Sequence, residues 1–172
     1  MLNVSTHLPD SLYFRSMVAA DLEPVMALEV QAYSFPWSRG NFIDSLAAGY
    51  HALLLCSRTD HGGGPAEQVL GYLVAMPGVD EMHLLNITVA PDWQGRGLAH
   101  RLMDALQQHA LQHHMPTLWL EVRRSNQRAA AFYGRRGFQQ VGLRRGYYPA
   151  GLGQREDALV MRLDLSPPPP AP

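Results

Sequence analysis

The chain has 172 residues, of which 47% are apolar and 17% charged, with a net charge of −1, and this composition is typical of a globular protein with one hydrophobic core. It excludes a disordered or fibrous chain, and because no apolar run approaches about 18 residues, no membrane partner is expected. The start of the chain lacks the basic and apolar blocks of a secretion signal, so a cytoplasmic protein is expected.

The first half of the chain is predicted to contain three strands and two helices, because its apolar residues recur with the periods of those elements. Gly49 is expected to end the second helix. The glycine-rich stretch 60–67 is expected to be a mobile hairpin loop, and residues 1–10 an N-terminal extension. In chain order the elements are a strand at 13–17, helices at 21–32 and 38–48, and strands at 50–57 and 69–76.

The second half alternates strands with helices, and one domain over residues 11–165 with a mixed α/β fold is therefore predicted. Asn126 is expected to cap one of the helices and Gly137 to end it. The proline-rich residues 166–172 are predicted to be a disordered tail. The elements are a strand at 82–89, a helix at 98–114, a strand at 117–122, a helix at 126–136, and strands at 138–147 and 156–165.

The charges are unevenly distributed along the chain. Residues 1–95 contain three arginines and ten acidic residues, whereas residues 96–172 contain eleven arginines and five acidic residues. A basic half favours a phosphate-rich ligand and an acidic half a cationic one. All basic residues are arginine, which excludes a Schiff-base or phosphate-loop lysine, and the arginines are not interleaved with a stacking platform, so no nucleic-acid partner is expected.

The cysteine and the histidines give no site pattern. Cys56 is the only cysteine and lies in an apolar run, which predicts a small buried hydrophobe rather than a nucleophile. His109, His113 and His114 lie on a predicted helix without a partnering cysteine or carboxylate motif. We therefore expect no metal.

A glycine-containing turn at 91–99 connects the strand that ends at Val89 to the helix that begins near Leu98. Its glycines let backbone N–H groups turn toward one anion, and the helix N-terminus adds donors and a positive dipole end, which predicts a pyrophosphate site. A Walker loop and a dinucleotide fingerprint both fit poorly, since lysine is absent and His100 stands where the fingerprint needs glycine or alanine. A purely structural turn is the alternative.

The turn matches the pattern Gln/Arg-x-x-Gly-x-Gly/Ala at Gln94, Gly97 and Ala99, and it resembles the pyrophosphate-binding loop of the GNAT superfamily of N-acetyltransferases. Nearly the whole chain resembles one branch, the RimI-type ribosomal-protein-alanine N-acetyltransferases. The matching stretches are Ser-Phe-Pro-Trp-Ser at 34–38, Asn-Ile-Thr-Val-Ala-Pro-Asp at 86–92, Leu-Trp-Leu-Glu-Val-Arg-Arg-Ser-Asn at 118–126, and Arg-Arg-Gly-Tyr-Tyr-Pro at 144–149 followed by Arg-Glu-Asp-Ala at 155–158. The chain departs from that family at Gly146, where Asn is usual, at His100, where Arg is common, and in a longer loop at 152–154.

The resemblance implies a single GNAT-like domain with a central, mostly antiparallel sheet flanked by about four helices. It implies acetyl-CoA as co-substrate. The implied partner is a small-subunit ribosomal protein, whose N-terminal alanine accepts the acetyl group. It assigns cofactor contacts to Ile87, Thr88, Val89, Gly95, Arg96, Gly97, Leu98, Ala99, His100 and Asn126. The first three of these would act through their backbone, as if the cofactor were one more strand.

Two residues suit proton transfer. In the predicted strand at 117–122, Glu121 shares a face with Trp119 and Arg123, although a surface glutamate paired with Arg123 or Arg124 is the alternative. The phenol of Tyr133 can give a proton to a leaving thiolate. A core aromatic is the alternative for this helix. The resemblance assigns the proton acceptor to Glu121 and the donor to Tyr133.

The acceptor side is less defined by the sequence. Two aromatic segments could either wall the acceptor site or belong to the core: Phe35, Pro36 and Trp37, and Tyr147 and Tyr148. On the helix at 126–136, a core role fits Phe132 better than Tyr133. Three functions stay open: an Nα-acetyltransferase, a GNAT enzyme for a lysine side chain, polyamine or antibiotic, and a non-catalytic acyl-CoA-binding module. The presence of both proton-transfer residues disfavours the third.

Overall fold

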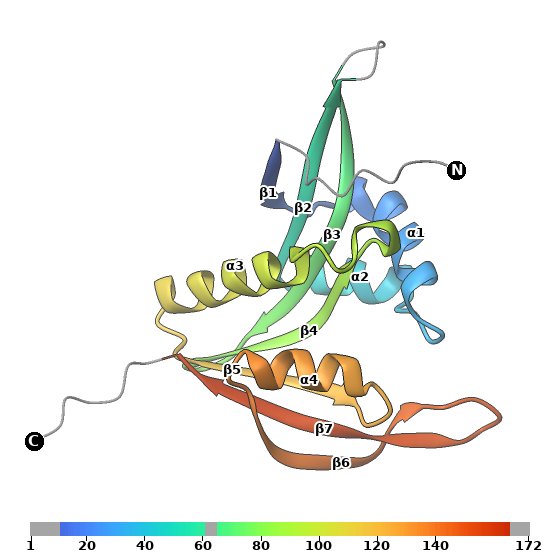
Figure 1. The fold of residues 1–172 in the computed structure, drawn as a ribbon, viewed down its shortest axis with the longest axis vertical. Coiled ribbons are helices and arrows are strands. Elements are labelled where there is room, and N and C mark those ends of the chain that lie inside the picture. Colours follow the sequence, from blue (N-terminus) through green and yellow to red (C-terminus); the bar gives the residue numbers. More distant parts are fainter. Residues whose placement is uncertain (1–10, 61–64, 166–172) are drawn as a thin grey trace, which may run out of the picture. The chain divides into compact units, whose positions relative to one another are not determined.

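The computed structural model describes residues 11–60 and 65–165. The predicted extension at 1–10, the tail at 166–172 and residues 61–64 of the predicted loop lie outside the described residues. Within the described ranges, four α-helices accompany one seven-stranded sheet with the strand order β1-β2-β3-β4-β5-β7-β6 (Figure 1). The predicted mixed α/β fold is confirmed.

The chain divides into two compact units, which are described in turn. The first unit contains the chain up to Ala75 together with Asn86–Ala105, and the second contains Met76–Leu85 together with the chain from Leu106. The elements in chain order are β1 (Leu12–Ser16), a 3-10 turn (Ala19–Asp21), α1 (Leu22–Ala32), α2 (Arg39–Ala47), β2 (His51–Asp60), β3 (Pro65–Pro77), β4 (Glu81–Val89), a 3-10 turn (Pro91–Trp93), α3 (Leu98–Gln112), β5 (Thr117–Arg123), α4 (Gln127–Arg135), β6 (Gln139–Pro149) and β7 (Arg155–Asp164).

In the first unit, β1 pairs with β2 and β2 with β3, both antiparallel. The predicted loop at 60–67 is wrong at both ends, because β2 and β3 stay paired as far as Asp60 and Pro65. Backbone pairing carries the hairpin beyond its last apolar residue, and apolar periodicity does not report such an extension. Gly49, with φ of +74°, follows α2 as predicted.

The core of the first unit forms where α1 and α2 contribute apolar side chains to those of β2 and β3. Phe42 of α2 packs its ring edge-on against Tyr72 of β3, with centroids 5.8 Å apart. The strand β4 approaches β3 closely at Gly71, where a Cβ atom would lie only 2.7 Å from the Thr88 carbonyl oxygen. The cluster comprises Met17, Leu22, Val25, Phe42, Ala52, Leu54, Cys56, Tyr72 and Val74.

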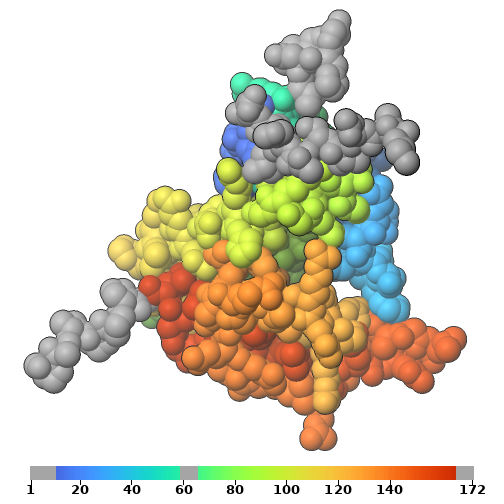
Figure 2. Space-filling model, in the orientation of Figure 1, coloured from blue at the N-terminus to red at the C-terminus, as the bar shows by residue number. Residues whose placement is uncertain are grey.

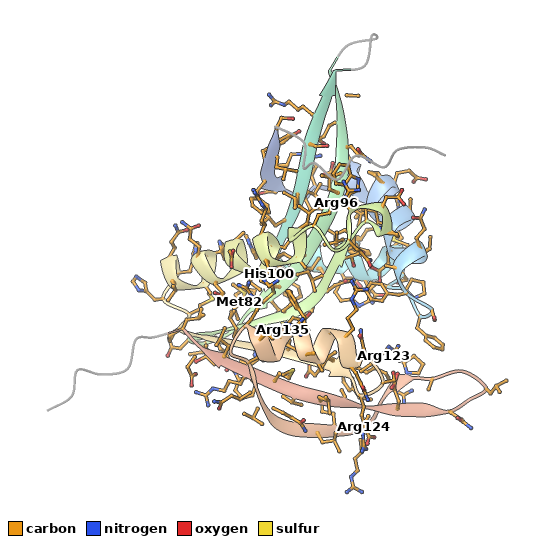
Figure 3. All side chains as sticks on the ribbon, in the orientation of Figure 1. Met82, Arg96, His100, Arg123, Arg124 and Arg135 are labelled. Carbon is orange, nitrogen blue, oxygen red and sulfur yellow. The ribbon has the colours of Figure 1, made fainter. Side chains whose placement is uncertain are left out.

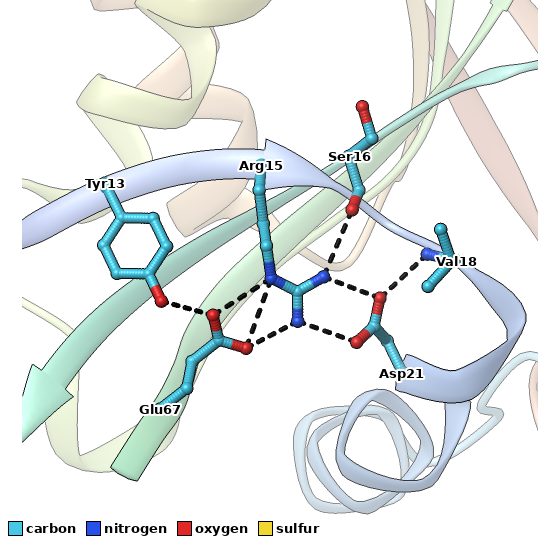
Figure 4. A network of polar contacts seen from close by, with 6 residues as sticks. All are labelled: Tyr13, Arg15, Ser16, Val18, Asp21 and Glu67. Carbon is cyan, nitrogen blue, oxygen red and sulfur yellow. Dashed lines mark hydrogen bonds and ion pairs between the residues drawn. The ribbon is translucent and has the colours of Figure 1, made fainter. Parts of the chain in front are cut away.

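A polar network ties β1 to β3 and to the start of α1 (Figure 4). The Arg15 guanidinium contacts Asp21 at 2.7 Å and Glu67 at 2.5 Å, and the Tyr13 hydroxyl also donates to Glu67. Arg15 holds the pKa of both carboxyl groups below the usual range. The network therefore connects β1 and the start of α1 to β3, which is distant from them in sequence.

In the second unit, β4 and β5 run parallel over Glu81–Leu84 and Thr117–Leu120, and β7 pairs antiparallel with both β5 and β6. Asn126 caps α4 by accepting a hydrogen bond from the Ala129 amide at 3.1 Å, as predicted. The end of the β6–β7 hairpin projects from this unit, in orange and red (Figure 2). None of the helices described in either unit is long and apolar enough to cross a bilayer.

Candidate functional site

The turn between β4 and α3 has open space beside its glycines. Gly95 and Gly97 have φ angles of +73° and +79°, and a Cβ atom built on either would meet nothing within 4 Å. The Arg101 amide donates to the Gly97 carbonyl oxygen at 3.2 Å. The amides of residues 98–100 precede this bond in the first turn of α3, where a helix offers them no main-chain acceptor. Figure 3 labels Arg96 and His100 at this point. The backbone here can hold a phosphate group.

Two side chains brace this turn. The Gln94 amide nitrogen donates to the Val89 carbonyl oxygen at 3.2 Å, which ties the turn to the end of β4. The Arg96 guanidinium lies over the Trp93 ring, 4.7 Å from its centroid. The glutamine of the sequence pattern therefore has a structural role in the turn.

The backbone of Ile87–Val89 is engaged by side chains. The Tyr33 hydroxyl donates to the Ile87 carbonyl oxygen at 2.6 Å and accepts from the Thr88 hydroxyl at 3.1 Å. Burial raises the pKa of Tyr33. A carbonyl oxygen has two lone pairs, so the Ile87 oxygen can still accept a second donor such as a pantetheine amide. Sequence reasoning missed Tyr33, because its partners lie 54 and 55 residues away and no local pattern points to them.

In the second unit, β5 alternates as predicted. Leu118, Leu120 and Val122 are buried, and Glu121 lies on the opposite face. The Glu121 carboxylate forms an ion pair with Arg144 of β6, with Oε1 and Nε 3.0 Å apart. This face therefore carries a carboxylate and a guanidinium in contact.

Arg123 and Arg124, the alternative partners expected for Glu121, form ion pairs with carboxylates of β7. Arg123 pairs with Glu156 at 2.8 Å, and Arg124 pairs with Asp157 at 3.5 Å. The reason is strand order, since β7 lies between β5 and β6 and brings partners from distant segments beside β5. Arg123 and the Ser125 amide together hold the pKa of Glu156 below its usual range.

Both tyrosines predicted for the acceptor site lie near Glu121. The Tyr148 hydroxyl donates to the Glu121 carbonyl oxygen at 3.1 Å, and the Arg123 guanidinium lies 4.5 Å from the Tyr148 ring centroid. The Tyr147 ring lies edge-on to Tyr148 at 4.9 Å and beneath Arg144 at 5.4 Å. The structure thus brings three of the predicted site residues together.

Gly146 explains one departure from the family pattern. Its φ of +56° is left-handed, a conformation that glycine adopts freely and asparagine tolerates better than other residues. Its amide donates to the Asp157 carboxylate at 2.9 Å. Glycine therefore meets the backbone requirement of this position.

Tyr133 lies on the inward face of α4 and is 7% exposed, whereas Phe132 is only partly buried. The expectation that Phe132 fits a core role better is therefore wrong, because the helix places residue 133 against Phe138, with ring centroids 5.6 Å apart. A buried phenol can still transfer a proton to a group that reaches it.

Pro36 and Trp37 belong to the first unit. The Trp37 ring is partly buried and lies 5.2 Å from the Phe42 ring, while Phe35 and Pro36 are exposed. Within the described ranges, no group of three or more His, Cys, Asp or Glu residues is arranged to hold a metal. Cys56 is fully buried, as predicted, and burial raises the pKa of its thiol to about 11.

Comparisons with known proteins agree with this architecture. The model of the acetyltransferase (GNAT) family matches residues 22–138. A ribosomal protein bS18-alanine N-acetyltransferase from Escherichia coli K12 is 36% identical over 151 residues, which are 88% of this chain and 96% of the relative. A protein of the same name from Haemophilus influenzae is 35% identical over 83% of this chain and 92% of the relative.

Solved structures give the same result. The crystal structure of the ribosomal-protein-S18-alanine N-acetyltransferase from Escherichia coli has a TM-score of 0.78 at 35% identity, covering 91% of this chain and 95% of that one. Ard1 from Thermoplasma volcanium shares the fold, with a TM-score of 0.75 at 20% identity over 91% of this chain and 99% of that one. The chain belongs to the GNAT family and is an acetyl-CoA-dependent N-acetyltransferase.

Proposed function

We propose that the protein transfers the acetyl group of acetyl-CoA to the N-terminal α-amine of a ribosomal protein that begins with alanine. The observation that carries this proposal is the similarity to the bS18-alanine N-acetyltransferases, which extends over most of the chain. The Tyr147 and Tyr148 rings beside Glu121 offer an apolar wall for a small first residue.

The chemistry favours an α-amine over a lysine side chain. An α-amine has a pKa of about 8, whereas a lysine amine has a pKa of about 10.4, so the α-amine loses its proton more readily at neutral pH. The acidic first half of the chain also suits a cationic peptide, as the N-terminus of a ribosomal protein would be.

We assign the roles of the residues as follows. Gly95, Gly97 and the first amides of α3 hold the pyrophosphate, and the backbone of Ile87–Val89 orients the pantetheine. Arg96 and His100 flank this path. Bound acetyl-CoA supplies the thioester carbonyl that the amine attacks.

Three protons have to move. Glu121 takes one from the acceptor ammonium, and the neutral amine can then attack. Tyr133 gives one to the departing sulfur, and the proton that the attacking nitrogen loses as the amide forms restores the phenol.

The experiment is tandem mass spectrometry on a synthetic peptide that begins with Ala and continues with several Arg and Lys residues. We expect a single acetyl group on the first nitrogen. A copy whose N-terminus is already blocked is the matched control. Lysine acetylation on the blocked copy at a similar rate would support a side-chain acetyltransferase instead. No reaction with either peptide would point to a small amine, such as a polyamine or an antibiotic.

A further inference from the structure

Glu29 of α1 is a buried carboxylate to which the proposed mechanism gives no role. Glu29 as a whole is only 1% exposed. One oxygen, Oε1, accepts from the Trp37 amide at 2.7 Å, and the other, Oε2, accepts from the Tyr72 hydroxyl and from the Asn86 amide at 3.1 Å. A single carboxylate thus joins α1 to the α1–α2 turn, to β3 and to β4.

The contacts continue from Asn86 to the β4 backbone. The Thr88 hydroxyl lies 3.3 Å from the Asn86 side-chain oxygen and 3.1 Å from the Tyr33 hydroxyl, which in turn donates to the Ile87 carbonyl oxygen. All of these residues belong to the first unit. The network therefore runs from the Trp37 amide to the strand that we assign to pantetheine.

A buried carboxylate costs more to desolvate than an apolar side chain, and here three donors offset that cost. One of these donors, the Trp37 amide, belongs to the backbone of the turn, which Glu29 therefore fixes. Pro36 restricts φ just before the anchored amide, and Trp37 packs its ring on Phe42. The turn is held at Trp37 and presents Phe35 and Pro36 to solvent.

We propose that Glu29 is a positioning residue for the acceptor. By anchoring the Trp37 amide, it holds Phe35 and Pro36 in an arrangement that can contact the acceptor peptide. Through Asn86, it keeps this turn in register with β4. The inference rests on the proposed function, since it takes an acceptor peptide as the occupant of the turn.

The variant Glu29→Gln tests this role selectively. A glutamine has one accepting oxygen, which satisfies two donors if it faces Tyr72 and Asn86. Its NH₂ group then faces the Trp37 amide, so two donors oppose each other and the turn loses its anchor. We expect the KM for the Ala-initiated peptide to rise about tenfold, the effect of losing one hydrogen bond to a charged group, with the acetyl-CoA affinity unchanged.

Tyr72→Phe is the matched control, because it removes a donor from the same carboxylate and leaves the Trp37 contact in place. We expect it to lower the melting temperature and to leave the peptide KM within about twofold of the wild type. A purely structural role for Glu29 would instead make KM follow the melting temperature in both variants. That result would overturn the proposal.

Hydrogen exchange followed by mass spectrometry reports the anchor without any acceptor. The amides of residues 34, 35, 37 and 38 should exchange faster in Glu29→Gln and at the wild-type rate in Tyr72→Phe. Normal turnover with an unchanged KM in Glu29→Gln overturns the positioning role alone. A wild-type protein that binds acetyl-CoA but does not acetylate the peptide overturns the proposed acceptor, and the positioning role falls with it.

Discussion

The Nε atom of Arg144 lies 3.0 Å from the Glu121 carboxylate, so the proposed proton acceptor already has a cationic partner. The Arg144 side chain is 57% exposed, and an ion pair this exposed contributes little to stability. Its effect should therefore appear in kinetics, because the guanidinium fixes the orientation of the carboxylate.

We expect Arg144→Gln to lower kcat by about tenfold, since a misdirected carboxylate meets the acceptor proton less often. The melting temperature should change little. Arg145→Gln, a change of the neighbouring exposed arginine, is the control and should keep the wild-type rate. Equal losses in the two variants would mean that the charge of β6, and not this pair, sets the rate.

Glu121→Gln should lower kcat by roughly 10² or more, the usual contribution of a positioned general base. Acetyl-CoA binding should survive, and so should the bond from Tyr148, which goes to the Glu121 backbone oxygen. Steady-state kinetics with the Ala-initiated peptide provide the measurement, with Glu81→Gln as a carboxylate control in the same unit. Full rate in Glu121→Gln from neutral to mildly alkaline pH would assign deprotonation to another group or to solvent.

Tyr133→Phe should lower kcat by a comparable or smaller factor than Glu121→Gln, because it removes the proton proposed for the leaving sulfur. The ring stays against Phe138, so the fold should be kept. Thiol release followed in single turnovers is the measurement. Phe132→Leu changes the adjacent ring and should leave this step unaffected, and a wild-type rate in Tyr133→Phe would remove the phenol from the mechanism.

Gly97→Glu should abolish acetyl-CoA binding, because a side chain and a negative charge would enter the open space beside the turn. The φ of +79° strains any side chain there by roughly 1 kcal/mol. Gly97→Ala carries the same strain without the charge and is the matched control. Calorimetric titration of both variants should show a much larger loss for Glu, and unchanged affinity in Gly97→Glu would exclude the turn as the phosphate site.

Asp21 should make the protein acid-sensitive. Arg15 lowers its pKa in the folded state, so the stability from this pair is present above the unfolded-state pKa of about 4 and is lost as pH falls through the folded-state value. Asp21→Asn should therefore cost about 1–3 kcal/mol at pH 7, since the side chain is only 12% exposed and bonded to Arg15. The difference from wild type should shrink below about pH 4 in urea titrations. Glu23→Gln, on the exposed side of α1, should show no such effect.

Local features were predictable from the sequence because they depend on neighbours along the chain. The alternation of β5 placed Glu121 opposite the buried leucines, and Asn126 and Gly49 marked helix boundaries. The glycine turn before α3 was recognisable for the same reason, since its left-handed residues and the helix start are adjacent in sequence.

The partners of the site residues were decided by tertiary structure alone. Arg144 lies near Glu121 because β7 pairs with both β5 and β6 and so brings these two strands into one sheet. Asn86 reaches Glu29 across 57 residues of sequence. Strand order and the packing of α1 against β3 and β4 determine these meetings, and no short-range pattern encodes them. The sequence therefore determined which residues are proposed to carry the chemistry, while the tertiary structure decided which charges and hydrogen bonds each of them meets.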